Sequence, residues 1–188
     1  MAHLILVKHS LVTVDPDVPR ESWPLSEEGR RRCVPLAEAL AAFAPTVLVS
    51  SLEGKAQQNA ELIAPRLGLP VTVVEGLHEN DRRGLPVVST SLFRKRMAMF
   101  FKDWHERVMG MESAEEALLR FDTAVRGVVD AHPGETIVII AHGAVIALFV
   151  AAHNQCDPFP YWQTLDLPSM AILTLPDFQL QETVARVE

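Results

Sequence analysis

The sequence predicts an α/β domain built as a three-layer α/β/α sandwich around a mainly parallel central sheet. Two segments, Leu4–Val7 and Ile137–Ala141, are uniformly apolar, as is typical of strands that are buried on both faces. Such segments alternate with helical patterns at the spacing of β-α-β units, which place parallel strands in one sheet with helices on both faces. The 188 residues, 48% of them hydrophobic, suffice for one sizeable core, so we expect a single domain over 1–188.

The first half of the chain is predicted as strand, loop, helix, strand, helix and strand. After the first strand, residues 10–25 contain three prolines, which favour a loop that lies over the strand end. Ser26 offers an N-cap for a helix in which Pro35 should introduce a kink or delay the start. The next elements are a strand at 46–49, a helix at about 53–64 that Pro65 and the Gly-Leu-Pro turn at 68–70 should end, and a strand at 71–74.

Residues 91–130 are predicted to form two helices with a break near Gly110, the second starting with a capping box at Ser113. After the strand that ends at residue 141, residues 144–152 are apolar almost all round, which predicts a buried helix. Residues 157–162 are rich in proline and aromatics and are predicted as a loop, followed by strands at 170–175 and near 178–187. We expect 76–110 to form a lid-like excursion, with its methionines packed in the lid or core.

Five polar residues are predicted at the carboxyl ends of the strands, where open α/β sheets bind ligands. They are Lys8, His9, Lys55, Glu79 and His142. A neutral imidazole can attack phosphorus in line, while cations and a second imidazole hold the phosphoryl oxygens and a carboxyl group protonates the leaving oxygen. The set therefore suits phosphoryl transfer without a metal.

Neighbouring residues leave some roles open. Asp81 competes with Glu79 as the acid, and Arg82 and Arg83 either steer substrate or face solvent. His78 flanks the acid in the mouth of the predicted site, where it could contact substrate. The other histidines show no metal-ligand spacing, and we expect neither a metal nor a cofactor.

Composition bounds the partners and the compartment. A net charge of −7 and a pI near 5.5 argue against binding to nucleic acid or to an anionic membrane surface. The chain contains no apolar stretch of membrane-spanning length and runs directly into a strand without a signal-peptide pattern, so we expect a cytoplasmic protein. Cys33 and Cys156 are expected to be free thiols, and the aromatic stretch at 157–162 could form a homodimer contact.

Several motifs together resemble the histidine phosphatase superfamily, which includes the cofactor-dependent phosphoglycerate mutases. Residues 6–10, Leu-Val-Lys-His-Ser, look like its Arg-His-Gly signature, and residues 24–30 are similar to its Leu-Thr-x-x-Gly segment. Residues 50–60 look like its Ser-Ser-Pro-x-x-Arg-Ala-x-Gln-Thr-Ala element. Residues 77–79 and 141–143 fall where the family carries its acid and its second histidine.

The resemblance implies a phosphoglycerate mutase-like fold and hydrolysis of a small phosphorylated metabolite through a phosphohistidine. His9 would be the nucleophile and Glu79 the proton donor. The resemblance also makes Lys8, Lys55, His142 and the backbone N–H of Gly143 the contacts to phosphate. His78 and Arg82 are added as substrate contacts because they flank the acid in the sequence.

The chain departs from the family pattern at three positions: Lys8 and Lys55 stand where the family has arginine, and Ser10 stands where it has glycine. Arginine binds phosphate through a planar fork, whereas lysine is a point charge without fixed geometry. Two alternatives therefore remain beside a phosphatase. One is a catalytically impaired pseudophosphatase that binds a phosphorylated ligand, and the other is a phosphoglycerate mutase-type phosphotransferase, which the short chain disfavours.

Overall fold

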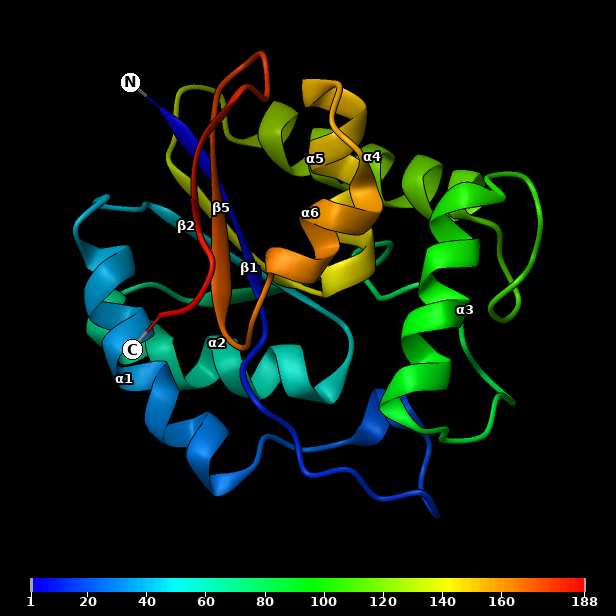
Figure 1. The fold of residues 1–188 in the computed structure, drawn as a ribbon. Helices are drawn as coiled ribbons and strands as arrows, with labels where there is room; N and C mark the ends of the chain where they lie inside the picture. The colour runs from blue at the N-terminus through cyan, green and yellow to red at the C-terminus, as the bar shows by residue number, and fades with distance from the viewer. Residues whose placement is uncertain (1, 188) are drawn as a thin grey trace.

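A six-stranded sheet forms the centre of the computed structural model, which describes residues 2–187 (Figure 1). The spatial order is β3-β2-β4-β1-β5-β6; β3, β2, β4 and β1 pair in parallel, and β5 and β6 are antiparallel. The mainly parallel sheet is thus confirmed. The strands are β1 His3–Lys8, β2 Val47–Ser51, β3 Val71–Val74, β4 Ile137–Ala141, β5 Ser169–Thr174 and β6 Leu180–Val184.

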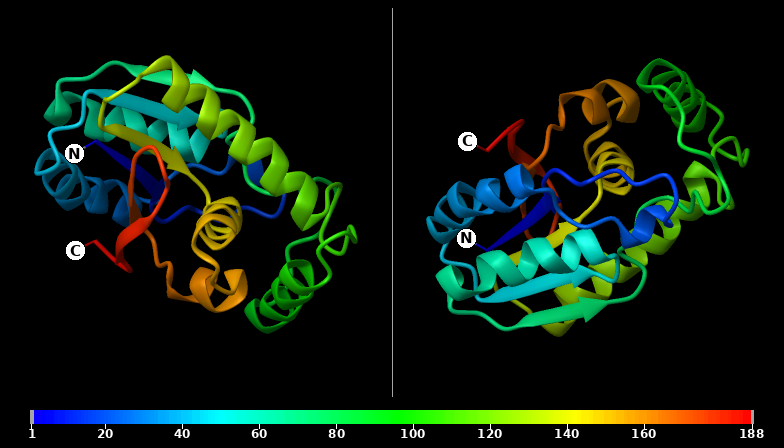
Figure 2. Two further views of the ribbon diagram at one scale, coloured as in Figure 1. Left: turned by 90° about the horizontal axis from the view of Figure 1, so that it is seen from above. Right: turned by 90° about the horizontal axis from the view of Figure 1, so that it is seen from below.

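Helices cover both faces of the sheet, as predicted. The side chains of β1 contribute to the hydrophobic core on each face. Alternate residues of a strand point to opposite faces. Accordingly Ile5 and Val7 pack in the core beneath α1 and α2, whereas Leu4 and Leu6 join a larger core with α3, α4 and α5. In all views of Figures 1 and 2, α3 lies at the end of the molecule opposite α1. The helices are α1 Glu27–Ala41, α2 Gly54–Leu67, α3 Thr90–Lys102, α4 Ala114–Ala131, α5 Gly143–Asn154 and α6 Pro158–Thr164.

The helix N-caps are those that the sequence predicts, but Pro35 and Pro65 affect the ends of their helices less than expected. The Ser26 hydroxyl accepts a hydrogen bond from the N–H of Gly29, and Ser113 forms the predicted capping box. α1 begins at Glu27, so Pro35 does not delay its start. Pro65 does not end α2, because one missing hydrogen bond near the last turn is tolerated. The helix runs to Leu67 and ends at the other predicted signal, Gly68, whose φ of 67° is left-handed.

The prediction of a loop at 157–162 is wrong, because these residues form most of α6. Its prolines fall at the first and third helical positions, where the backbone N–H has no partner inside the helix, so they cost nothing there. The Asp157 side chain caps the helix by accepting from the N–H of Phe159. α6 thereby holds an aromatic group over the sheet edge at which the polar residues gather.

The excursion at 76–110 is anchored in the main core. Met97 and Met109 are fully buried, whereas Met99 and Met111 are at least half exposed, so the methionines divide between core and surface. Gly110 adopts a φ of 114°, and a Cβ there would lie 1.9 Å from the carbonyl oxygen of Asp81. This close approach fixes the loop after β3 against the segment before α4.

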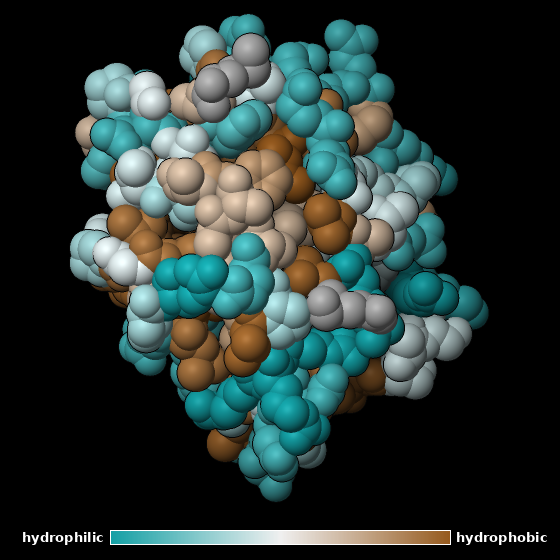
Figure 3. All heavy atoms as spheres, turned by 90° about the vertical axis from the view of Figure 1, so that its left-hand side faces the viewer, coloured by the Kyte–Doolittle hydropathy of each residue, from teal (hydrophilic) through white to brown (hydrophobic). Residues whose placement is uncertain are grey.

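On the face that Figure 3 shows, moderately to strongly hydrophobic residues adjoin one another at the upper centre, and hydrophilic residues surround them. Within the described part of the chain, no helix combines the length and apolarity that crossing a membrane requires.

Gly29 should be intolerant of any side chain. A Cβ at this position would lie 2.1 Å from the carbonyl oxygen of Leu11, in the segment that follows His9. We expect Gly29→Ala to lower the free energy of unfolding by about 2 kcal/mol, because backbone rather than a flexible side chain must move. Gly127→Ala, on the exposed side of α4 with nothing within 4 Å of the new Cβ, should instead be neutral or stabilising. Equal midpoints in urea denaturation for both variants would contradict this reading.

Candidate active site

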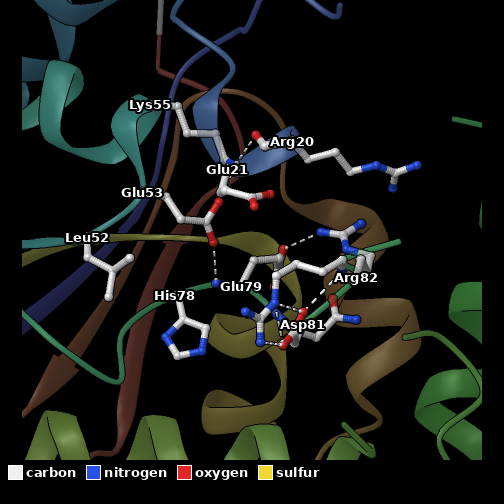
Figure 4. A pocket seen from close by; sticks show the side chains of 11 residues that line it. Arg20, Glu21, Leu52, Glu53, Lys55, His78, Glu79, Asp81 and Arg82 are labelled. Atoms are coloured by element: carbon white, nitrogen blue, oxygen red, sulfur yellow. Dashed lines mark hydrogen bonds and ion pairs between the residues drawn. The ribbon is translucent and has the colours of Figure 1, made fainter. Parts of the chain in front are cut away.

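Four of the five predicted polar residues, which are His9, Lys55, Glu79 and His142, lie together at the carboxyl edge of the sheet, and the Lys8 side chain turns toward a neighbouring cavity. His9 directly follows β1, and its backbone N–H donates to the carbonyl oxygen of Ala141 at 3.1 Å, beside His142. Lys55 lies in the first turn of α2, and Glu79 lies in the loop after β3. Figure 4 shows Lys55, Glu53, Glu79 and Arg82 around one cavity.

The imidazole of His9 has a defined tautomer. Its Nδ1 lies 2.7 Å from the carbonyl oxygen of Ser10, and a carbonyl oxygen can only accept, so Nδ1 carries the proton and Nε2 keeps its lone pair. Burial, followed by the charges of His142 and Lys55, holds the pKa of His9 well below its usual value. The ring is therefore neutral at pH 7, and Nε2 is available as a nucleophile.

His142 lies beside His9, with ring centroids 5.2 Å apart. Its Nε2 lies 2.9 Å from the hydroxyl of Ser51 and 3.5 Å from Oε1 of Glu53. Its buried Nδ1 has no hydrogen-bond partner among the described residues. Burial and the charge of Lys55 hold the pKa of His142 well below its usual value. Since buried polar atoms are normally paired, the free Nδ1 is a position for a ligand oxygen.

Glu79 is held as a carboxylate at the N-terminus of α5. Its oxygens accept from the N–H groups of Ala144 at 3.2 Å and Val145 at 3.3 Å, and one lies 3.2 Å from Nη2 of Arg82. Burial raises the pKa of Glu79, but Arg82, His142 and the helix N–H groups outweigh it, so the net pKa is lowered. Glu79 is thus anionic in the resting site.

The competing acid, Asp81, lines the same cavity as Glu79 but is bound to a different arginine. It pairs with Arg83 at 2.5 Å, and the Arg83 side chain is 73% exposed. Of the two arginines left open by the sequence, Arg82 therefore faces the site and Arg83 faces solvent. The imidazole of His78 lines the same cavity as Glu79, and its Nδ1 has no hydrogen-bond partner among residues 2–187.

A charged pair that the sequence did not reveal fixes the loop carrying Glu79. Arg120 of α4 donates to the carbonyl oxygens of Gly76 at 2.7 Å, His78 at 2.9 Å and Glu79 at 3.2 Å. Its guanidinium also pairs with Glu112 at 2.5 Å. In the sequence Arg120 resembles an ordinary solvent-facing helix residue, and no local signal separates it from its neighbours.

Glu53 is the second residue that sequence reasoning missed. Its carboxylate forms an ion pair with Lys55, and its Oε1 accepts from the backbone N–H of Glu79 at 2.8 Å. Lys55 also donates to the carbonyl oxygen of Arg20 at 3.1 Å. Both members of the pair are 7% exposed. Lys55 therefore reaches the site as predicted, but with a carboxylate already bound to it.

Lys8 is the predicted residue that the structure places least directly. Its Nζ donates to the carbonyl oxygen of Leu165 at 2.7 Å and lines a separate cavity of about 420 Å³ with Arg94 and Asp166. Its stem passes Gly143, where an added Cβ would lie 3.1 Å from Cε of Lys8. Gly143 thus leaves room for the lysine, besides beginning the helix that holds Glu79.

Two cavities meet at Arg20, Lys55 and Arg82, which line both. The larger, about 410 Å³, contains Glu53, His78 and Glu79. The smaller, about 270 Å³, contains His9 and is walled by apolar side chains of Val12, Val14, Trp23, Val87, Val88 and Phe93. The Arg82 guanidinium lies over the Phe93 ring, 5.3 Å from its centroid. A small ligand could therefore bind between a cationic region and an apolar wall.

The described residues form neither a metal-ligand cluster nor a disulfide. Residues 2–187 contain no group of three histidine, cysteine, aspartate or glutamate side chains placed to hold a metal ion. Cys33 and Cys156 are free, and burial raises the pKa of Cys33 to about 11.

Lys8 should lose its proton at an unusually low pH. Burial lowers its pKa from 10.5 to about 8, although Glu79 and Asp166 partly oppose this shift. Because the folded pKa is depressed, the ammonium charge is complete below pH 7 and is lost as the pH rises through about 8. NMR of 13C-labelled lysine side chains should show one resonance titrating there. That resonance should be absent in Lys8→Arg, and its persistence in the variant would exclude Lys8 as the source.

Known proteins resemble the chain in sequence and in fold. It is 28% identical over 133 residues to the probable phosphoglycerate mutase GpmB of Cronobacter sakazakii, covering 68% of this chain and 62% of that protein. It is 26% identical over 139 residues to the uncharacterized phosphatase PhoE of Bacillus subtilis, covering 72% and 67%. The first of these matches therefore spans less than two thirds of the relative.

Solved structures share the fold at lower identity. A mycobacterial glucosyl-3-phosphoglycerate phosphatase superposes with a TM-score of 0.74 at 23% identity, over 91% of this chain and 89% of that one. Bacillus stearothermophilus YhfR superposes with a TM-score of 0.76 at 22% identity, over 96% and 95%. The phosphoglycerate mutase-like fold is thereby confirmed. The sequence model of the histidine phosphatase superfamily (branch 1) matches residues 4–184, so the chain belongs to the histidine phosphatase superfamily.

Proposed function

We propose that this protein is a metal-independent phosphatase that hydrolyses a small phosphorylated metabolite through a phosphohistidine on His9. The observation that carries the proposal is the bond from His9 Nδ1 to the carbonyl oxygen of Ser10, which leaves a neutral Nε2 beside a cationic cavity. Membership of a superfamily of histidine phosphatases supports the same chemistry. The sequence-based expectations of a cytoplasmic location, of a possible homodimer and of no nucleic-acid or membrane partner accompany this proposal.

In the first step, Nε2 of His9 attacks phosphorus while the bond from phosphorus to the ester oxygen breaks. The cations Lys55 and Arg82 line the His9 cavity, and His142, whose Nδ1 is free, lies directly beside His9. Held donors and cations stabilise the charge that develops on the phosphoryl oxygens. The leaving alkoxide takes a proton from the carboxyl group of Glu79.

Glu79 must gain that proton when substrate binds, since the resting site holds it as a carboxylate. A phosphoryl dianion repels the carboxylate and competes with it for Arg82 and for the N–H groups at the start of α5. Both effects raise the pKa of Glu79. The bound ester thus converts the carboxylate to the acid that its own leaving group needs.

In the second step, Glu79 is again a carboxylate and removes a proton from a water molecule. The water oxygen attacks phosphorus, the bond from phosphorus to Nε2 breaks, and His9 returns to its neutral tautomer. Inorganic phosphate then leaves. The single carboxylate serves first as acid and then as base, and the hydrogen bond to Ser10 keeps the imidazole oriented in both steps.

His9→Ala should abolish turnover of phosphate monoesters, by at least a thousandfold, because the nucleophile is lost. We would assay a broad panel of esters in the presence of EDTA, and trap the acid-labile phosphoenzyme after rapid mixing with labelled substrate. The matched control is His105→Ala, because His105 is a surface histidine with a 74% exposed side chain. The control should retain full activity and labelling.

Other outcomes would point to the alternatives. Absence of His9-dependent turnover on every ester, with phosphate binding intact, would favour a pseudophosphatase that binds a phosphorylated ligand. The ion pair between Lys55 and Glu53, and the hydrogen bond that directs Lys8 to the carbonyl oxygen of Leu165, favour that reading. Transfer of the label to an added phosphorylated acceptor instead of water would indicate a mutase-type phosphotransferase.

Glu79→Gln should reduce kcat by about 10²–10⁴-fold for alkyl phosphates, because a poor leaving group needs the proton. An aryl phosphate with an acidic leaving group should lose much less in the phosphorylation step. Asp81→Asn is the control, since the Asp81 carboxylate is bound to Arg83 and not to Arg82, and it should change kcat less than threefold for either ester. The same dependence on the leaving group in Asp81→Asn would assign the acid to Asp81.

A further inference from the structure

The resting site carries its own counter-charges. Among the described residues that line both cavities, Lys55 is paired with Glu53, and Arg82 is paired with Glu79. The second pair has a role in the proposed chemistry, because Glu79 is the acid. The first pair does not: nothing in the two steps requires a carboxylate on Lys55.

Glu53 is firmly held in this position. It precedes α2 as its N-cap residue, two positions before Lys55, and its side chain lies in the cavity (Figure 4). One carboxylate oxygen pairs with Lys55, and the other accepts from the N–H of Glu79 and lies 3.5 Å from Nε2 of His142. A single buried carboxylate therefore contacts three of the groups that the phosphoryl chemistry uses.

The charge of Glu53 persists at neutral pH. Burial alone raises its pKa, but the charge and hydrogen bond of Lys55 and the N–H of Glu79 lower it more. A buried carboxylate that keeps its charge must be satisfied by such partners. Any anion that enters the cavity therefore meets a lysine whose charge is already balanced.

We propose that Glu53 is a positioning residue that occupies Lys55 in the resting site and weakens the hold of the site on phosphate. The inference rests on the proposed function in one respect, which is that Lys55 contacts the phosphoryl group. An incoming phosphoryl group must take over Lys55 from Glu53, and after hydrolysis Glu53 takes Lys55 back. The exchange limits product inhibition, because free phosphate competes with an internal carboxylate for the same ammonium group.

The two contacts of Glu53 can be separated by an isosteric change. Glu53→Gln removes the negative charge but keeps an oxygen that can accept from the N–H of Glu79. If Glu53 served only as a scaffold for the Glu79 loop, this variant would bind phosphate as the wild type does or more weakly. If Glu53 competes for Lys55, the variant should bind phosphate more tightly.

The test is calorimetric titration of the full chain with inorganic phosphate at pH 7. Glu53→Gln should lower the Kd for phosphate about tenfold, which corresponds to about 1.4 kcal/mol. The KM for an ester should fall, while kcat should not rise, because phosphate leaves more slowly. Glu53→Asp shortens the side chain by one methylene and so moves the charge away from Lys55; it should lower the Kd for phosphate by a smaller factor. This variant replaces Glu53→Gln in the test if Glu53→Gln does not fold.

The matched control is Glu21→Gln, which removes the same charge from the same cavity at a residue for which no contact with Lys55 is seen. It should change the Kd for phosphate less than twofold. A double-mutant cycle with Lys55→Gln should show non-additivity, since without the ammonium group Glu53 has little to compete for.

Unchanged or weaker phosphate binding in folded Glu53→Gln would overturn the inference, as would equal tightening in Glu21→Gln. Phosphate binding is measured without turnover, so it is independent of whether the protein hydrolyses esters. If the wild type shows no His9-dependent hydrolysis, the proposed function is refuted. The comparison of phosphate binding between the Glu53 variants and the wild type still tests the inference about Glu53.

Discussion

The parallel pairing of β1 with β4 is the interaction on which the site depends. The register places Lys8 opposite Ala141, and the N–H of His9 extends the ladder one step further by bonding to the carbonyl oxygen of Ala141. Both strands are fully buried in the core through their apolar residues. Because slippage by one residue would turn every side chain to the opposite face, burial of these strands also fixes the distance between His9 and His142.

Several charged side chains are buried around His9 and His142. Burial of these charges is tolerated because each carboxylate is bound to a cation and to backbone N–H groups. Glu79 is satisfied by Arg82 and by the start of α5, and Glu53 by Lys55 and the N–H of Glu79. Each carboxylate thus belongs to a network whose members are arranged before any ligand arrives. Such preorganisation spares the reaction the cost of orienting dipoles as charge moves.

The parts of the molecule that were predictable from the sequence are those governed by local patterns. Uniformly apolar runs located β1 and β4, and with them the positions of His9 and His142, because a strand that stops abruptly delivers the next residue to the sheet edge. Helix caps at Ser26 and Ser113 were equally readable. The order of the motifs then gave the family, which the sequence model confirms.

What escaped prediction depends on contacts between distant parts of the chain. Glu53 and Arg120 have roles only because tertiary packing brings them to the Glu79 loop from α2 and α4. Lys8 was correctly placed at the strand end, yet the direction of its long side chain is decided by the carbonyl of Leu165, 157 residues away. The helix at α6 was missed because the position of a proline relative to the first turn, and not its presence, decides whether it breaks a helix.

Half of the apolar wall of the His9 cavity, which is Val87, Val88 and Phe93, belongs to a different part of the chain from the histidines. Val87, Val88 and Phe93 lie before and within α3, at the far end of the molecule from α1, whereas His9 and His142 follow central strands. Changes in this part of the wall therefore need not disturb the paired strands that orient His9, the proposed nucleophile. Substitutions in this part of the wall could therefore change which leaving group a phosphatase accepts without altering its reacting centre. The segment that includes α3 is accordingly the one to vary when selectivity is engineered.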